Sequence, residues 1–148
     1  MIALRFIDDA NPFSEAIKLF ERGWCAHVDA VMPGGSFLGA RLDGGVASRP
    51  ADYIVPTREQ YVHLAATPQQ ESDFYAFLNS QLGKPYDTTA IAAFAVERDW
   101  RTPDSWFCSE LQARALEICG FFPKPLASPA NEITPRDLLL CVSPWAAA

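Results

Sequence analysis

Apolar and polar residues alternate in several short stretches of the chain, and this period of two predicts β-strands. These stretches are residues 2–7, 24–32, 36–42 and 59–66. Pro33-Gly34-Gly35 connects the second and third stretches, which are expected to pair as a hairpin, and Asp43-Gly44-Gly45 would break the returning strand. Because alternate residues of a strand share a face, His27 and Asp29 are predicted to lie on the same side of the sheet.

Apolar residues at steps of three and four predict helices elsewhere in the chain. These helices would start at Asn11-Pro12, at Thr67-Pro68, in the Ala-rich run 88–96, at Cys108 and at Thr134-Pro135. In the second helix the apolar stripe comprises Phe74, Phe77, Leu78 and Leu82. A polar loop is expected over 97–105 and an exposed or loosely docked tail over 143–148. Since strands and helices are partly segregated, the sequence predicts an α+β fold, with a small antiparallel sheet packed against the helix that begins at Cys108.

The predicted helix that begins at Cys108 is the first candidate for chemistry. Its apolar side comprises Leu111, Ala115, Ile118 and Cys119, and its polar side comprises Glu110, Gln112, Arg114 and Glu117. The first N–H groups of a helix have no intrahelical partner, and the helix dipole adds positive charge there, so a thiolate at Cys108 would be stabilised. A free cysteine is more often an inert core residue, so the catalytic interpretation depends on partners elsewhere in the chain.

Length and charge narrow the classes of function. The chain has 148 residues with an apolar fraction of 49%, which suits one domain over 1–148. The net charge is −6 and no basic cluster is present, which argues against nucleic acid or an anionic membrane surface as a partner. The N-terminus lacks the pattern of a signal peptide, and no apolar run reaches the roughly 20 residues of a transmembrane helix. A cytoplasmic protein is therefore expected.

The cysteines and histidines do not form a metal motif. Cys25, Cys108, Cys119 and Cys141 contain no C-x-x-C pair, and the two histidines do not add zinc-ligand spacing. We therefore expect reduced thiols, no metal and no cofactor, with the other three cysteines in the core. A redox or metal-handling protein is the alternative that this pattern disfavours.

A cysteine nucleophile needs a base, and usually a third group that orients the base. His27 lies mid-strand among apolar neighbours and is the favoured base, whereas His63 follows Tyr61 in a more polar strand and suits a surface or structural role. Asp29 could orient the His27 ring, or it could be an exposed strand carboxylate. In the expected hairpin Gly39 and Arg41 lie opposite His27 and Asp29, so Arg41 could equally neutralise Asp29.

Tyr86 lies in the turn-like segment Gly83-Lys84-Pro85-Tyr86-Asp87. Its hydroxyl could donate a hydrogen bond to an oxyanion, although a tyrosine after proline often packs in a turn. Trp100, Trp106 and Phe107 near Cys108 suit either a substrate wall or core packing.

Three segments together resemble a known family. Trp24-Cys25-Ala26-His27-Val28-Asp29-Ala30-Val31, Leu82-Gly83-Lys84-Pro85-Tyr86-Asp87 and Trp106-Phe107-Cys108-Ser109-Glu110-Leu111 are similar to segments of circularly permuted papain-fold hydrolases, the YiiX-like branch of the NlpC-type cell-wall peptidase superfamily. In that permuted group the strand histidine precedes the cysteine helix, as His27 precedes Cys108 here. The resemblance extends from the Asn11 helix to about Gly120.

The resemblance implies a papain-like fold and particular site residues. Cys108 would be the nucleophile, His27 the base and Tyr86 a residue lining the site. Relatives commonly carry the orienting polar group on the strand after the histidine strand, where this chain has Gly39, Arg41 and Asp43, so Asp29 is our substitute. Relatives also usually have serine before the histidine, where this chain has Ala26.

These observations predict a cysteine-dependent hydrolase or acyltransferase acting on an amide, ester or thioester bond. The resemblance suggests a peptide, a peptidoglycan fragment or a lipid amide as substrate, and a bacterial or phage-associated protein. Without the pattern of a signal peptide, such a protein would act inside the cell or be exported by another route. The alternative is a non-catalytic relative in a phage or cell-wall assembly that uses the same cleft to hold a peptide.

Overall fold

The computed structural model describes residues 1–9, 12–88 and 104–147. Five strands form one antiparallel sheet in the order β4-β3-β2-β1-β5. The strands are β1 (Ile2–Asp8), β2 (His27–Val31), β3 (Phe37–Arg41), β4 (Gly45–Arg49) and β5 (Arg58–Leu64). The predicted α+β class with an antiparallel sheet is thereby confirmed.

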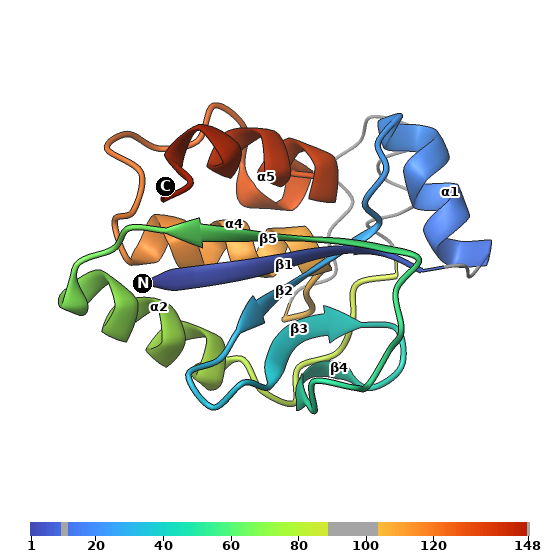
Figure 1. Cartoon of the computed structure of the whole chain (residues 1–148), viewed down its shortest axis with the longest axis horizontal. Helices are drawn as coiled ribbons and strands as arrows, with labels where there is room; N and C mark the ends of the chain where they lie inside the picture. Colours follow the sequence, from blue (N-terminus) through green and yellow to red (C-terminus); the bar gives the residue numbers. More distant parts are fainter. Residues whose placement is uncertain (10–11, 89–103, 148) are drawn as a thin grey trace.

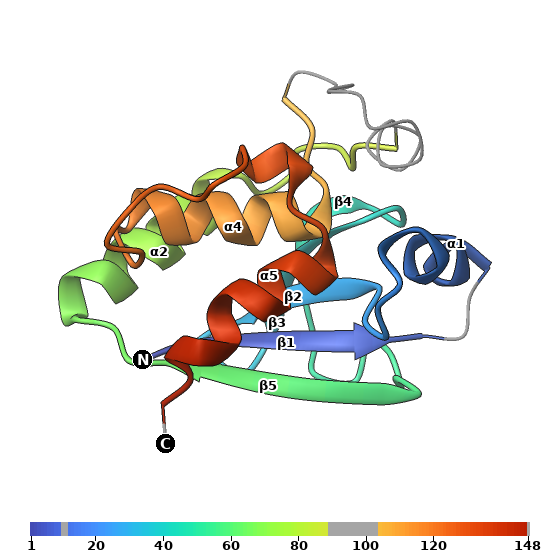
Figure 2. The same cartoon turned by 90° about the horizontal axis from the view of Figure 1, so that it is seen from above.

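Helices lie on one face and at one end of this sheet. They are α1 (Pro12–Glu21), α2 (Pro68–Ser80), α4 (Cys108–Ile118) and α5 (Pro135–Val142), with short 3₁₀ turns η1 (Ala130–Glu132) and η2 (Ser143–Trp145). Figures 1 and 2 show α2, α4 and α5 on the same face, and α1 beyond the end of the sheet. No helix in the described ranges is long and apolar enough to cross a membrane.

The alternation along the strands separates two different faces. Leu4, Ala30 and Leu38 are paired across three neighbouring strands and are fully buried in the core cluster that includes α4. The residues between them point to the other face, where Arg5 of β1 lies directly opposite Asp29 of β2. His27 and Asp29 are therefore on the face opposite to the helices.

The predicted polar side of the Cys108 helix is wrong for its first two turns. Glu110 and Gln112 are 2% and 0% exposed, whereas Ile118, assigned to the apolar side, is 45% exposed. The helix is covered by the sheet, α2, α5 and η1, so most of its circumference is in the interior. The buried side-chain amide of Gln112 donates to the Leu38 carbonyl at 3.0 Å, and this hydrogen bond joins α4 to β3.

Several boundaries differ from the sequence pattern. β2 begins at His27 rather than at residue 24. β4 was not predicted, because its first residue, Gly45, belongs to the Asp43-Gly44-Gly45 run, which forms a tight turn. Leu82 lies beyond the end of α2 and is exposed, while Phe74 and Leu78 are buried as predicted.

The remaining predictions concern the helix caps, the segment before Cys108 and the C-terminal tail. The cap at Asn11, the predicted helix 88–96 and the loop 97–105 fall wholly or mostly outside the described residues. α5 starts at Pro135 with Thr134 as its N-cap, as predicted. The tail is exposed but anchored, because the Ala147 amide donates to the His63 carbonyl at 2.7 Å.

Candidate active site

α4 begins at Cys108, as the sequence predicted. Phe107 precedes it in extended conformation, and the Glu110 carboxylate accepts a hydrogen bond from the Phe107 amide at 3.3 Å. This contact at the first turn fixes where the helix starts. The Cys108 side chain is fully buried at the point where helix N–H groups and the helix dipole favour negative charge.

Tyr86 is held beside this helix start by backbone pairing. Residues 85–87 run parallel to 105–107, with the Trp106 amide donating to the Pro85 carbonyl and the Asp87 amide to the Trp106 carbonyl, each at 3.0 Å. The Tyr86 ring lies 5.6 Å from the Phe107 ring, centroid to centroid. Burial and then the charge of Cys108 raise the pKa of Tyr86, so its hydroxyl keeps its proton and can donate.

The segment that carries Tyr86 is also joined to the edge of the sheet. The Val46 amide donates to the Lys84 carbonyl, and the Gly83 amide donates to the Val46 carbonyl, both at 2.9 Å. β4, the strand that the sequence pattern missed, is therefore the element that places residues 83–86 against the sheet.

His27 and Asp29 form a hydrogen-bonded pair on β2. His27 Nε2 lies 2.9 Å from Asp29 Oδ1, and Asp29 is 1% exposed. The two residues share a face because they are two apart in a strand, as predicted. With Nε2 bound to the carboxylate, Nδ1 is the ring nitrogen left to exchange a proton with a substrate or thiol.

Two residues that sequence reasoning did not assign complete the surroundings of Asp29. Tyr53, in the connection between β4 and β5, donates its hydroxyl proton to Asp29 Oδ2 at 2.5 Å. Gly39 on β3 leaves room for the carboxylate, since a Cβ at that position would overlap Asp29 Oδ1. A glycine within a strand signals close approach of another group. The expected hairpin already set Gly39 opposite His27 and Asp29, but the sequence did not show that the glycine leaves room for the carboxylate.

The charge state of Asp29 follows from these contacts. Burial alone would raise the pKa of Asp29. The charge and hydrogen bond of His27, the hydrogen bond from Tyr53 and the charge of Arg41 outweigh burial and lower that pKa below its ordinary value. Asp29 is therefore ionised near neutral pH. It is buried rather than exposed on the strand, and it receives both the imidazole contact and the influence of Arg41.

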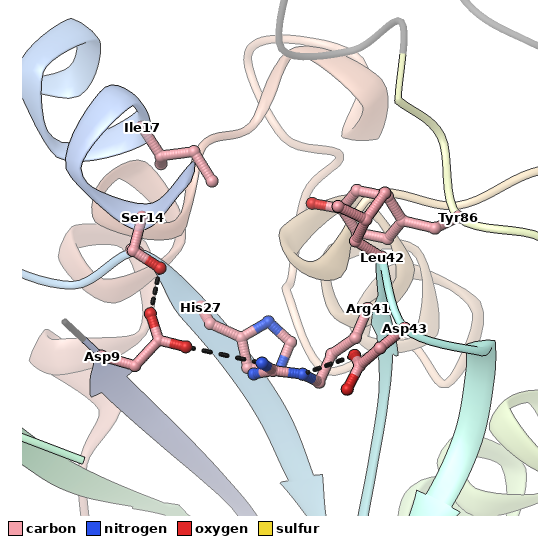
Figure 3. Close-up of a pocket in the computed structure, with 9 residues that line it drawn as sticks. Asp9, Ser14, Ile17, His27, Arg41, Leu42, Asp43 and Tyr86 are labelled. Carbon is pink, nitrogen blue, oxygen red and sulfur yellow. Dashed lines mark hydrogen bonds and ion pairs between the residues drawn. The ribbon is translucent and has the colours of Figure 1, made fainter. Parts of the chain in front are cut away.

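A cavity of about 400 Å³ opens beside His27. Figure 3 shows its walls, which include His27, Tyr86, Ile17 of α1 and a run of ion pairs from Asp9 through Arg41 to Asp43. Arg41 contacts Asp9 at 3.4 Å and Asp43 at 3.1 Å. The cavity therefore combines a histidine, a hydroxyl donor and charged groups of both signs.

Cys108 and His27 come from opposite faces of the sheet. α4 packs on β2 and β3, and Figures 1 and 2 both show its N-terminal end at the end of the sheet where β2 begins. His27 is the first residue of β2, and Tyr86, next to the start of α4, lines the same cavity as His27. The start of α4, which is Cys108, and the start of β2, which is His27, therefore lie at the same end of the sheet.

The other candidates lie elsewhere. His63 is exposed on β5, pairs with Ala3 and stacks on Tyr61 with 6.5 Å between ring centroids. Cys25 and Cys119 are buried, whereas Cys141 is only partly buried. Within the described ranges, no group of three or more His, Cys, Asp or Glu residues could hold a metal ion.

In comparisons with known proteins, no family model matches this chain and no curated protein matches it.

Proposed function

We propose that this protein is a cysteine-dependent hydrolase or acyltransferase that cleaves an amide bond, with a permuted papain-like arrangement of its site. The observation that carries the proposal is the buried hydrogen bond between His27 and Asp29, at the end of the sheet where the Cys108 helix begins. A base with its own orienting carboxylate is what a cysteine nucleophile needs.

Acylation would start from the Cys108 thiolate and the protonated His27 ring. The thiolate attacks the substrate carbonyl carbon, and the carbonyl π electrons move to oxygen as the carbon–sulfur bond forms. The backbone N–H of Cys108 and the protonated Tyr86 hydroxyl would stabilise this oxyanion. When the oxyanion collapses, the carbon–nitrogen bond breaks and the leaving amine takes the proton from His27.

Deacylation would reverse these roles. Water, or another acceptor, attacks the thioester carbonyl while neutral His27 takes its proton. Collapse of the second oxyanion expels the thiolate, releases the acid or the transferred product, and leaves His27 protonated as at the start. Ionised Asp29 would stabilise the imidazolium in both steps. A peptide, including a peptidoglycan stem peptide, is the leading substrate class, and lipid amides are the second.

The alternative was a non-catalytic relative that binds a peptide. Its support was the lack of an obvious third residue on the strand after His27. The hydrogen bond between His27 and Asp29 weakens that support, because the orienting group can come from the histidine strand itself.

Alkylation by iodoacetamide at pH 7, followed by mass spectrometry of each cysteine, tests the proposal. Exposure alone favours Cys141, which is partly exposed, over Cys108, which is fully buried. Burial and the nearby Asp137 also raise the pKa of Cys141, so it reports an unactivated thiol. We expect Cys108 to react faster than Cys141 and His27→Ala to remove that advantage.

Turnover of an activated ester gives the second readout. With p-nitrophenyl acetate we expect a burst of one equivalent that Cys108→Ala abolishes and Cys141→Ala retains. Equal alkylation of all four cysteines, together with no burst, would overturn the proposal.

A further inference from the structure

Tyr53 binds the oxygen of Asp29 that His27 leaves open. His27 Nε2 lies 2.9 Å from Oδ1, and the Tyr53 hydroxyl donates to Oδ2 at 2.5 Å. The carboxylate is thus held from both sides, by an imidazole on its own strand and by a phenol from the connection between β4 and β5. A hydrogen bond to a charged acceptor is stronger and more directional than one between neutral groups.

The Tyr53 ring is itself held in place by its neighbours. The guanidinium carbons of Arg5, Arg41 and Arg49 lie 5.9, 5.4 and 5.9 Å from the ring centroid. Phe37 meets the ring edge-on, with 6.1 Å between centroids. Cations over an aromatic face are attracted to it, so this surrounding keeps the phenol directed at Asp29.

Positive groups face Asp29 from each neighbouring strand. Arg5 of β1 is its cross-strand partner, and Arg41 of β3 contributes charge to it. Beyond them, Arg49 of β4 approaches the same Tyr53 ring. Arg5 and Arg41 also pair with acidic partners, Glu59 for Arg5 and Asp9 and Asp43 for Arg41. Asp29 is therefore buried next to a histidine on its own strand and an arginine on each neighbouring strand, and these arginines share their charge with other carboxylates.

We propose that Tyr53 is a positioning residue for the reaction. It holds the ionised Asp29 carboxylate in the orientation in which Oδ1 accepts a hydrogen bond from Nε2 of His27. Nδ1 of His27 then stays available for proton exchange. This inference rests on the proposed function. Tyr53 acts through Asp29 and His27 and does not itself touch the reacting atoms.

Removal of the Tyr53 hydroxyl should make the His27 imidazolium less stable and leave the Tyr53 ring in place. In Tyr53→Phe the ring remains among the same side chains, while Oδ2 loses its donor. Asp29 then becomes protonated at a higher pH, and a neutral carboxyl stabilises the His27 imidazolium less than a carboxylate does. The thiolate that depends on this imidazolium is lost over the same pH range.

The experiment is the rate of Cys108 alkylation by iodoacetamide between pH 4 and 9, for the full chain and two variants. For Tyr53→Phe we expect an acid limb shifted up by about one pH unit, so that the reaction is roughly tenfold slower than in the wild type at pH values on that limb and little changed at pH 7 and above. Tyr75→Phe is the matched control, because the Tyr75 hydroxyl donates at 2.9 Å to the Val31 carbonyl of the same strand β2 and does not contact Asp29. We expect Tyr75→Phe to lower the melting temperature and to leave the pH profile unchanged.

Superimposable pH profiles of wild type and Tyr53→Phe would overturn the inference. Independently of any variant, ¹⁵N chemical shifts of His27 in the wild-type protein should show that the neutral ring, at alkaline pH, carries its proton on Nε2. A neutral ring protonated on Nδ1 would also overturn the inference. Failure of the proposed function is distinguishable, because in that case wild-type Cys108 reacts no faster than Cys141.

Discussion

Asp29 shows how the contacts of a single residue shape the candidate site. A carboxylate that is 1% exposed is ordinarily costly, yet it receives hydrogen bonds from His27 and Tyr53 and faces Arg5 across the sheet. Gly39 is part of the same arrangement because only a residue without a Cβ leaves space for Oδ1.

Gly39→Ala should therefore lower both the stability of the fold and the reactivity of Cys108. The added methyl group overlaps Asp29 Oδ1, so the carboxylate must turn away from His27. We expect a loss of about 1–3 kcal/mol in the free energy of unfolding, as for other overpacked sites, and at least about tenfold slower Cys108 alkylation. Urea titration and the alkylation rate measure the two effects.

Gly34→Ala is the control for this substitution. Gly34 lies in the turn before β3, and nothing lies within 4 Å of where its Cβ would be. It should leave both measurements near wild type. A Gly39→Ala protein with normal alkylation would show that the position of Asp29 does not matter for the thiol.

Among the elements, the segment 83–87 determines how the two halves of the site are joined. It pairs with β4 through Val46 on one side and with 105–107 through Trp106 on the other. Tyr86 is therefore tied both to the sheet that carries His27 and to the start of the helix that carries Cys108.

Gly45→Ala should disturb this junction. Gly45 has a φ of +64°, and a Cβ there would overlap the Lys84 carbonyl, which is backbone and cannot move aside cheaply. We expect residues 84–86 to shift, with a lower melting temperature and a smaller p-nitrophenyl acetate burst.

Gly83→Ala provides the matched comparison. Gly83 has a similar positive φ of +84°, but nothing lies within 4 Å of where its Cβ would be. The Gly83→Ala variant is therefore destabilised only by the left-handed backbone conformation, which costs about 1–2 kcal/mol. If both variants lost the same activity, backbone strain rather than displacement of Tyr86 would be the cause.

For the whole molecule, Asp29 links stability to pH. Its pKa in the folded state is below the ordinary value of 3.8, so the unfolded chain binds a proton first as the pH falls. The stability from this group is present above about pH 4 and is lost as the pH falls through the folded-state pKa.

Asp29→Asn should remove this dependence. At pH 7 we expect the variant to be about 1–3 kcal/mol less stable, because an amide cannot accept hydrogen bonds from both His27 and Tyr53 through the two atoms that they contact. The difference should shrink towards pH 3. Urea unfolding at several pH values measures it, and a constant difference from pH 7 to pH 3 would contradict the assigned role of the carboxylate.

Local patterns determined most of the elements from the sequence. The hairpin of β2 and β3, the caps of α2 and α5 and the start of α4 at Cys108 all depend on residues within a few positions of one another. The common face of His27 and Asp29 also follows from the period of a strand. Such features are predictable because their physical causes act along the chain.

Only the tertiary structure decided what surrounds those residues. The sequence pattern predicts Glu110 and Gln112 on a polar side of the helix, but both are buried because the sheet, α2 and α5 cover α4. The spacing of apolar residues along one helix does not show which distant elements cover it. Likewise, Tyr53 lies 24 positions from Asp29 and reaches it only because the connection after β4 folds back across the sheet. The sequence by itself thus determined that His27 and Asp29 share one face of a strand and that a helix begins at Cys108. The packing of distant segments decided which carboxylate oxygen, which hydroxyl and which guanidinium groups surround them.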